Sequence, residues 1–275
     1  MHIKTLVCDL DGTLLAPGGG IHLSDTVADA LISLQKKGVT LVLASARIFQ
    51  GILPIALQLQ MDHYQGYIIV QNGTMGYDVA NKKVLFLHDI KKEDSLFLWN
   101  TAIQFGLDFA IAQPSYMIAS GYSEGFYLDH KNCEIDYLIT DRPSIYVKDE
   151  ICKCAASQKK EVLDTAFIPF QQEVNGRYPY QLVRSTDTII DIVKEKCTKD
   201  NGLQELFALT GQSFATAAAI GDGNSDAKMI QHSAYGVTLE NGSALCKQYA
   251  KQIVPSYREE GCLSLFQALL NAKKA

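Results

Sequence analysis

The sequence predicts an α/β fold, a doubly wound parallel sheet with a second, α+β domain inserted into it. Short apolar segments alternate with amphipathic helical segments in residues 1–86 and again in residues 186–275. Residues 87–185 lose this alternation and gain aromatic residues and polar loops. Since βαβ units with short connections form parallel sheets with right-handed crossovers, we expect the two outer segments to form one core domain. Residues 87–185 then form the inserted domain.

The first half of the core reads β-α-β-α-β. An apolar strand at 6–8 is followed by a helix from Ser24, a good N-cap, to the terminating Gly38. A strand rich in β-branched residues and leucine covers 39–43, because such residues fit a buried pleated surface. A helical stretch at about 50–60 leads to a third strand at 66–70.

The last part of the chain repeats this pattern, and the middle differs from it. A helix from Thr198 to Gly211 precedes a strand of small residues that ends in Gly-Asp-Gly at 221–223. In the middle, Pro169 should start, kink or end its helix, because proline lacks the N–H that a helix interior needs. The remaining expected elements are strands at 234–239 and 251–255 with a final helix at 260–272, and in the middle helices at 92–105 and 159–174 with strands at 109–112, 116–120, 151–157 and 180–185.

Composition narrows the class of protein. The net charge is −5 and the basic residues are scattered, so no nucleic-acid partner is expected. No apolar run approaches the ~18 residues that cross a membrane, and no apolar targeting segment is visible. The seven cysteines include no C-x-x-C pair, which is typical of buried thiols in a reducing compartment. We therefore expect a cytoplasmic protein without a membrane partner.

Two carboxylates follow the first strand directly, at Asp9 and Asp11. Ligands of an open parallel sheet bind beyond the carboxyl ends of its strands, so both side chains can face that crevice. Two adjacent carboxylates need a proton or a cation between them, and Mg²⁺ is commonly held by one or two carboxylates with substrate phosphate. One acid could attack phosphorus while the other transfers protons. The simpler reading, that Asp11-Gly12 is a turn, explains the glycine but not both acids.

Four further polar residues, in three segments of the chain, share this placement. Ser45 follows the second strand, Lys199 opens a helix whose positive end calls for a nearby anion, and Asp222 and Asp226 follow the small-residue strand. Each has an ordinary explanation taken singly: a helix cap, an exposed lysine, and a Gly-rich turn with capping acids. Their joint placement at strand ends and a helix start favours a phosphate and metal site.

These motifs resemble those of the haloacid dehalogenase-like superfamily of phosphohydrolases, and more narrowly its Cof-type branch. D-x-D-G-T-L, Ser45, Lys199 and G-D-x-x-x-D occur in the family's order. The resemblance spans nearly the whole chain and implies a Rossmann-like core with a large α+β cap of type IIB. The segments that carry it are "VTLVLASAR", "VQNGTMGY", "DIVKEKCTKDNGL", "IGDGNSDAKMI" and "GVTLENGSA".

The resemblance implies a role for each matching residue. Asp9 is the nucleophile that takes the phosphoryl group, and Asp11 is the acid/base. Mg²⁺ is bound by the Asp9 carboxylate, the Asp11 main-chain oxygen and Asp222, with Asp226 orienting this shell or a metal-bound water. The expected phosphate-binding residues are Leu10, Gly12, Ser45, Ala46, Lys199 and Ser225, and the expected substrate contacts are Arg47 and Asn72.

The sequence also departs from the family pattern. The usual Thr-Gly-Arg is Ser45-Ala46-Arg47, which keeps the hydroxyl. The loop before Lys199 has lost its glycine, and the customary Asn-Asp of the last motif reads Ser225-Asp226. These changes concern substrate fit more than chemistry.

The functional prediction is therefore a Mg²⁺-dependent phosphatase. It would hydrolyse a small phosphorylated metabolite, such as a sugar phosphate, through an aspartyl-phosphate. Two alternatives stay open: a sugar phosphomutase of the same superfamily, which uses the same acid/base, and a non-catalytic regulator that binds a phosphorylated metabolite. The intact pair of Asp9 and Asp11 disfavours the regulator. A receiver-type signalling domain, at ~120 residues, is much shorter than this chain.

Overall fold

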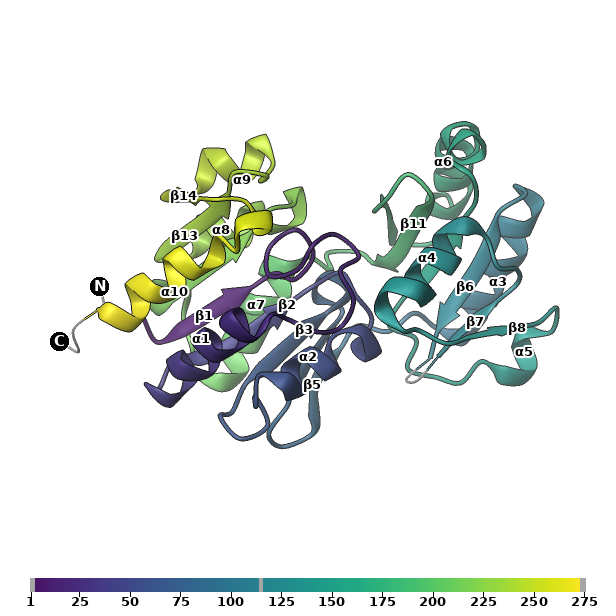
Figure 1. Cartoon of the computed structure of the whole chain (residues 1–275). Coiled ribbons are helices and arrows are strands. Elements are labelled where there is room, and N and C mark those ends of the chain that lie inside the picture. The colour runs from purple at the N-terminus through teal and green to yellow at the C-terminus, as the bar shows by residue number, and fades with distance from the viewer. Residues whose placement is uncertain (1–2, 114–115, 273–275) are drawn as a thin grey trace. The chain divides into compact units, whose positions relative to one another are not determined.

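The computed structural model describes residues 3–113 and 116–272, which fold into two compact units, each with its own β-sheet (Figure 1). Of the described residues, unit 1 comprises 3–47, 51–86 and 198–272, and unit 2 comprises 48–50, 87–113 and 116–197. Unit 2 thus continues past residue 185, the boundary expected from sequence, because strand β11 pairs with strands β9 and β10 inside it.

In the described residues, the sheet of unit 1 has the strand order β14-β13-β12-β1-β2-β3-β4-β5. The strands from β14 to β3 are parallel, which confirms the predicted doubly wound sheet, while β4 pairs antiparallel with β3. The strands are β1 (Thr5–Cys8), β2 (Thr40–Ala44), β3 (Tyr67–Val70), β4 (Met75–Asp78), β5 (Lys83–Leu87), β12 (Ala217–Gly221), β13 (Tyr235–Leu239) and β14 (Gln252–Val254).

Helices cover both faces of this sheet. Leu203 and Leu206 of α7 pack with Val7, Val42 and neighbouring residues of one face, all buried. Helices α1 and α10 lie side by side on the other face (Figure 1). The helices of unit 1 are α1 (Asp25–Lys36), α2 (Leu53–Gln58), α7 (Lys199–Thr210), α8 (Ala227–His232), α9 (Ala244–Tyr249) and α10 (Cys262–Asn271).

Unit 2 is an α+β layer structure with the described strand order β10-β11-β9-β6-β7-β8, antiparallel except between β7 and β8. Helices α3 and α6 pack on one face of this sheet and α4 on the other. Its strands are β6 (Asp108–Ala112), β7 (Met117–Ala119), β8 (Tyr137–Ile139), β9 (Cys154–Ser157), β10 (Tyr180–Arg184) and β11 (Ile189–Lys194), and its helices are α3 (Lys92–Gln104), α4 (Glu124–Cys133), α5 (Pro143–Tyr146) and α6 (Lys160–Asn175).

One sequence expectation in unit 2 is narrowed, and one strand is new. Of the three roles expected for Pro169, starting and ending its helix are excluded, because it lies inside α6. Strand β11 was not expected, because Asp191 interrupts its apolar pattern. In the structure Asp191 is buried and its carboxylate lies 2.7 Å from the Lys153 ammonium, so the charge is neutralised inside the sheet.

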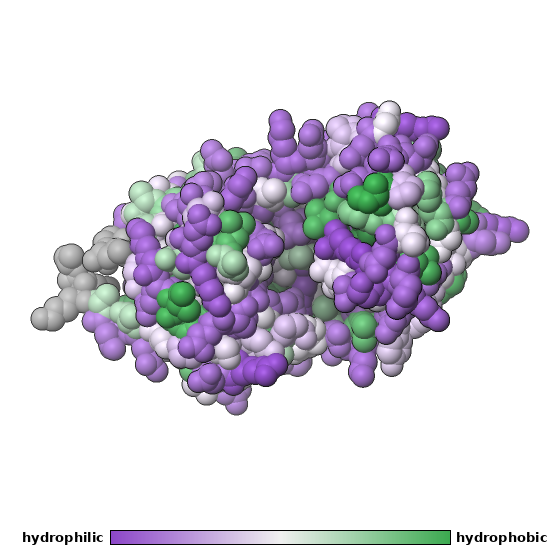
Figure 2. Space-filling model, turned by 90° about the horizontal axis from the view of Figure 1, so that it is seen from above, coloured by the Kyte–Doolittle hydropathy of each residue, from purple (hydrophilic) through white to green (hydrophobic). Residues whose placement is uncertain are grey.

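The surface carries both hydrophilic and apolar residues. Figure 2 shows hydrophilic residues over most of the visible face, with apolar residues in separate patches. Within the described ranges, no helix combines the length and the apolar character that crossing a bilayer requires.

Candidate active site

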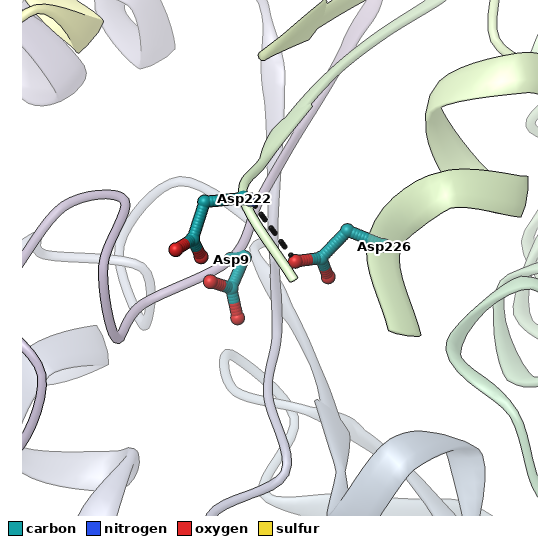
Figure 3. A group of neighbouring side chains, drawn as sticks. All are labelled: Asp9, Asp222 and Asp226. Atoms are coloured by element: carbon teal, nitrogen blue, oxygen red, sulfur yellow. Dashed lines mark hydrogen bonds between the residues drawn. The ribbon is translucent and has the colours of Figure 1, made fainter. Parts of the chain in front are cut away.

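The candidate site lies where the strand order of unit 1 reverses. Strand β1 lies between β12 and β2, and the chain leaves β1 and β12 at the same edge because both pairs are parallel. Asp9 follows β1 and Asp222 follows β12, so the two carboxylates meet at this edge (Figure 3). This is the topological switch point at which open α/β sheets bind ligands.

Three carboxylates converge there, and they are those of Asp9, Asp222 and Asp226, whereas the sequence predicts convergence of Asp9, Asp11 and Asp222. Asp9, Asp222 and Asp226 each offer an oxygen, and these oxygens lie within 4.8 Å of one another (Figure 3). The Thr13 hydroxyl lies between two of them, 3.0 Å from Asp9 Oδ2 and 3.3 Å from Asp222 Oδ1. Water has little access to these contacts, because Asp9, Asp226 and Thr13 are almost fully buried.

Lys199 brings a positive charge into this cluster. Its Nζ lies 2.6 Å from Asp9 Oδ1 and 2.6 Å from Asp226 Oδ1, and the side chain is buried. It is the first residue of α7, whose preceding Thr198 hydroxyl accepts the Asn201 N–H as an N-cap. We expect an anion beside a lysine at the positive end of a helix, and two carboxylates, Asp9 and Asp226, lie there.

Asp226 is occupied by protein donors on both oxygens. Oδ1 accepts from Lys199, and Oδ2 accepts the N–H groups of Asp222 and Gly223 at 3.1 and 2.9 Å. It therefore orients Asp222 and Lys199, the orienting role that the family resemblance implies for it, more readily than it would bind an ion itself.

The charges of the cluster do not balance. Three carboxylates against the Lys199 ammonium leave a formal charge of −2 when all are ionised. Burial raises the pKa of Asp9, the Asp226 carboxylate raises it further, and Lys199 only partly opposes this. Burial, and next the Asp9 carboxylate, raise the pKa of Asp222 to about 6. The protein alone thus resists full ionisation of these acids.

This donor set fits a hard divalent cation. Carboxylate oxygens are the ligands that Mg²⁺ prefers, and one divalent ion neutralises the −2 charge. The oxygens of Asp9 and Asp222 that lie nearest each other are the protein ligands such an ion would use.

The Asp11 carboxylate turns away from this cluster. Arg47 Nη2 and Nε donate to its two oxygens at 2.6 and 2.7 Å, and the Gly18 N–H donates to Oδ1 at 3.2 Å. Arg47 also donates to the carbonyl oxygens of Gly20 and Gly51 at 2.6 and 3.2 Å. Of the acids expected near the metal, Asp11 alone directs its side chain elsewhere in this conformation.

The expected phosphate-binding residues take different positions. Ser45 is buried, and its hydroxyl oxygen accepts the Arg47 N–H at 3.1 Å. The Gly12 N–H donates to the Leu15 carbonyl at 2.7 Å, so in this conformation it is not available to a phosphate. Leu10 is buried, Ala46 is half-buried and Ser225 is exposed.

Asn72, an expected substrate contact, follows β3. Its N–H donates to the Ser45 carbonyl at 3.0 Å, which ties it to the site. The side-chain oxygens of Asn72 and of the neighbouring Gln71 are buried and accept no hydrogen bond from the described residues. Buried acceptors of this kind normally have a partner, so a ligand donor would satisfy them.

Thr13 and Asn241 were not among the expected site residues. Thr13 belongs to the D-x-D-G-T-L motif, and Asn241 to "GVTLENGSA", so both lie in segments that carry the resemblance. Asn241 Nδ2 donates to the Gly12 carbonyl at 2.8 Å and to Asp222 Oδ2 at 3.1 Å. Sequence does not show that β13 and β1 bring these residues together.

Fold and site together define an α/β protein with an acidic cluster at the switch point of its core sheet. The chain belongs to the haloacid dehalogenase-like hydrolase family, whose sequence profile matches residues 6–266. The family assignment made from the motifs is thereby confirmed.

Similar proteins cover almost all of the chain. A Streptococcus pyogenes protein that carries a provisional phosphatase name is 26% identical over 262 residues, 95% of this chain and 96% of that protein. The HMP-PP phosphatase of Serratia proteamaculans is 24% identical over 89% of this chain and 86% of its own length. Among solved structures, a haloacid dehalogenase-like hydrolase from Bacteroides thetaiotaomicron has a TM-score of 0.90 at 24% identity, covering 97% of this chain and 99% of that one.

Proposed function

We propose that the protein is a Mg²⁺-dependent phosphatase that hydrolyses a small phosphorylated metabolite through an aspartyl-phosphate. The observation that carries this proposal is the group of Asp9, Asp222, Asp226 and Lys199, all buried except the half-buried Asp222, whose excess negative charge suits one divalent cation. The phosphatase names of the Streptococcus and Serratia relatives support it.

Asp9 is the proposed nucleophile, and the other residues of the site stabilise charge. Asp9 Oδ attacks phosphorus, the bond from phosphorus to the leaving oxygen breaks, and the phosphoryl group becomes bonded to Asp9. When bound, Mg²⁺ would supply charge stabilisation for the transferring phosphoryl oxygens. Lys199 contributes a second positive charge at the same point, and the Ser45 hydroxyl can donate to a phosphoryl oxygen.

Asp11 is the proposed acid and base. It gives a proton to the leaving alcohol and then takes one from the water that hydrolyses the aspartyl-phosphate. Because the Arg47 guanidinium holds both of its oxygens here, Asp11 must leave this pairing before it acts.

We propose a hydroxyl-bearing substrate such as a sugar phosphate. The unsatisfied carbonyl oxygens of Gln71 and Asn72 support this, because hydroxyl groups are donors that satisfy them. A fold neighbour is titled a subclass IIB sugar phosphatase, with a TM-score of 0.74 at 19% identity over 96% of this chain and 98% of that one. Unit 2, which supplies no residue of the acidic cluster, is proposed to select among substrates. The cysteines, which are buried except for the partly exposed Cys152 and include no C-x-x-C pair, support a cytoplasmic location.

A panel of phosphate esters tests the proposal, assayed with Mg²⁺ and with EDTA beside the Asp9→Asn variant. We expect Mg²⁺-dependent release of inorganic phosphate from a subset of esters and loss of it in Asp9→Asn. Transfer of the phosphoryl group to another sugar hydroxyl without phosphate release would instead establish the phosphomutase. Binding of esters without turnover would establish the regulator, and turnover unchanged in Asp9→Asn would refute the nucleophile.

A further inference from the structure

We propose that Asn241 is a positioning residue, which fixes the Asp222 carboxylate and the Gly12 turn in the geometry that a divalent cation requires. The inference rests on the proposed metal dependence and extends it to a residue outside the acidic cluster. Asn241 lies in the turn between β13 and α9, and its side chain reaches the turn that follows β1.

The contacts of Asn241 fix its amide in one orientation. Nδ2 donates to the Gly12 carbonyl at 2.8 Å and to Asp222 Oδ2 at 3.1 Å, while Oδ1 accepts the Tyr257 N–H at 3.1 Å. A main-chain N–H only donates and a carbonyl oxygen only accepts, so rotating the amide by 180° would break the bonds to Tyr257 and Gly12. The backbone at Tyr257 therefore sets the direction in which Asn241 offers its hydrogens.

Through these bonds Asp222 is held at both ends. The Ser243 N–H, from the same turn as Asn241, donates to the Asp222 main-chain oxygen at 2.8 Å. At the carboxylate, Oδ1 receives the Thr13 hydroxyl and Oδ2 receives Asn241 Nδ2. Rotation of the carboxylate about its bond would cost at least one of these hydrogen bonds.

Asn241 also holds the backbone next to Asp222. Gly12 adopts a φ of +79°, and a Cβ placed on it would lie 2.3 Å from Asp222 Oδ2. The turn and the carboxylate are thus in close contact, and one amide group binds both sides of that contact. Gly12 immediately follows Asp11, whose main-chain oxygen is an expected metal ligand.

This arrangement predicts an effect on metal choice. Mg²⁺ and Mn²⁺ favour near-ideal octahedral sites, while Ca²⁺ accepts irregular ones. Outer partners of metal ligands typically change metal affinity 10–100-fold when they are removed. Loss of the Asn241 donors should therefore weaken Mn²⁺ binding more than Ca²⁺ binding.

The test uses the full chain with Mn²⁺ and Ca²⁺ as probes. Asn241→Leu keeps the size of the side chain and removes its donors, and Asn241→Ala is a second variant in case the first folds poorly. Electron paramagnetic resonance gives Mn²⁺ binding and calorimetry gives Ca²⁺ binding. We expect a Mn²⁺ Kd raised about tenfold in both variants and a Ca²⁺ Kd raised less than threefold. Saturating Mg²⁺ should restore most of kcat.

The control is Gln231→Ala, which removes an exposed amide from α8 and should leave both constants unchanged. A Mn²⁺ Kd within twofold of the parent in both Asn241 variants would overturn the inference. Equal weakening of Mn²⁺ and Ca²⁺ binding, together with a lower urea midpoint of unfolding, would also overturn the inference. That result would mark a purely structural role for Asn241. If the parent bound no Mn²⁺ at all, the proposed function would fail first, and the two failures are thereby distinguishable.

Discussion

At the scale of single residues, Lys199 is the counter-charge for two buried acids. Removing its ammonium leaves Asp9 and Asp226 unpaired, which typically costs about 3–5 kcal/mol. We therefore expect Lys199→Met to lower the free energy of unfolding strongly in EDTA. The double variant Lys199→Met with Asp226→Asn should recover about 1–3 kcal/mol of that loss, because it removes one unpaired charge.

Urea unfolding of the parent, both single variants and the double variant forms the complete cycle. Additive losses, with no recovery in the double variant, would show that the ammonium does not neutralise Asp226.

Arg47 is the second residue whose geometry makes a definite prediction. Its guanidinium matches the Asp11 carboxylate with two parallel donors, which the single ammonium of lysine cannot reproduce. Arg47→Ala should lower stability by about 2 kcal/mol, and Arg47→Lys should recover less than half of that. Chemical denaturation without substrate measures this, and full recovery in Arg47→Lys would mean that charge alone matters.

At the scale of elements, the turn after β1 depends on a glycine in close contact with Asp222. Gly12→Ala introduces a Cβ into the Asp222 carboxylate, in addition to the cost of a positive φ. We expect this variant to lose at least about 100-fold in phosphatase kcat/KM, because small misplacements at a catalytic centre cost that much.

Gly38→Ala is the matched control for the turn. Gly38 has a φ of +85° and open space around its missing Cβ, so this variant shares the backbone cost without the clash. It should lose about 1–2 kcal/mol of stability and keep its activity. Equal activity losses in the two variants would mean that backbone strain, not the contact with Asp222, is responsible.

At the scale of the whole molecule, the acidic cluster sets how stability depends on pH. The pKa of Asp9 is raised to about 7 and that of Asp222 to about 6, so the folded protein binds more protons than the unfolded chain between about pH 4 and pH 7. Stability of the metal-free protein should therefore fall as the pH rises through this window, since the sign of the slope follows the excess of bound protons in the folded state.

Mg²⁺ should reverse this dependence, because it binds ionised carboxylates. Thermal unfolding with Mg²⁺ and with EDTA at pH 5 and pH 7.5 checks both statements: the increase in Tm with Mg²⁺ should be larger at pH 7.5. The double variant Asp9→Asn with Asp222→Asn should show little Mg²⁺ effect at either pH. An equal increase at both pH values in the parent would contradict the assignment of these acids.

Local pattern was sufficient for most of the fold and for the positions of Asp9 and Asp222, but not for the direction of the Asp11 carboxylate. The alternation of apolar strands with capped helices predicts the parallel sheet, because each element buries one face at its own period. The same pattern places Asp9 and Asp222 at strand ends, and these positions lie at the same edge of any parallel sheet. Strand β11 escaped prediction because the partner of Asp191, Lys153, is distant in sequence.

Sequence by itself determined the family, the parallel sheet and which charged residues could lie at the edge of that sheet. These features depend on residue type and spacing. Only the tertiary structure decided that the Asp11 carboxylate pairs with Arg47, that Asp226 is occupied by Lys199 and two main-chain N–H groups, and that Asn241 joins Gly12 to Asp222. Those pairings depend on distances between segments that are far apart in the chain. Tertiary packing fixes these distances, and local sequence pattern does not.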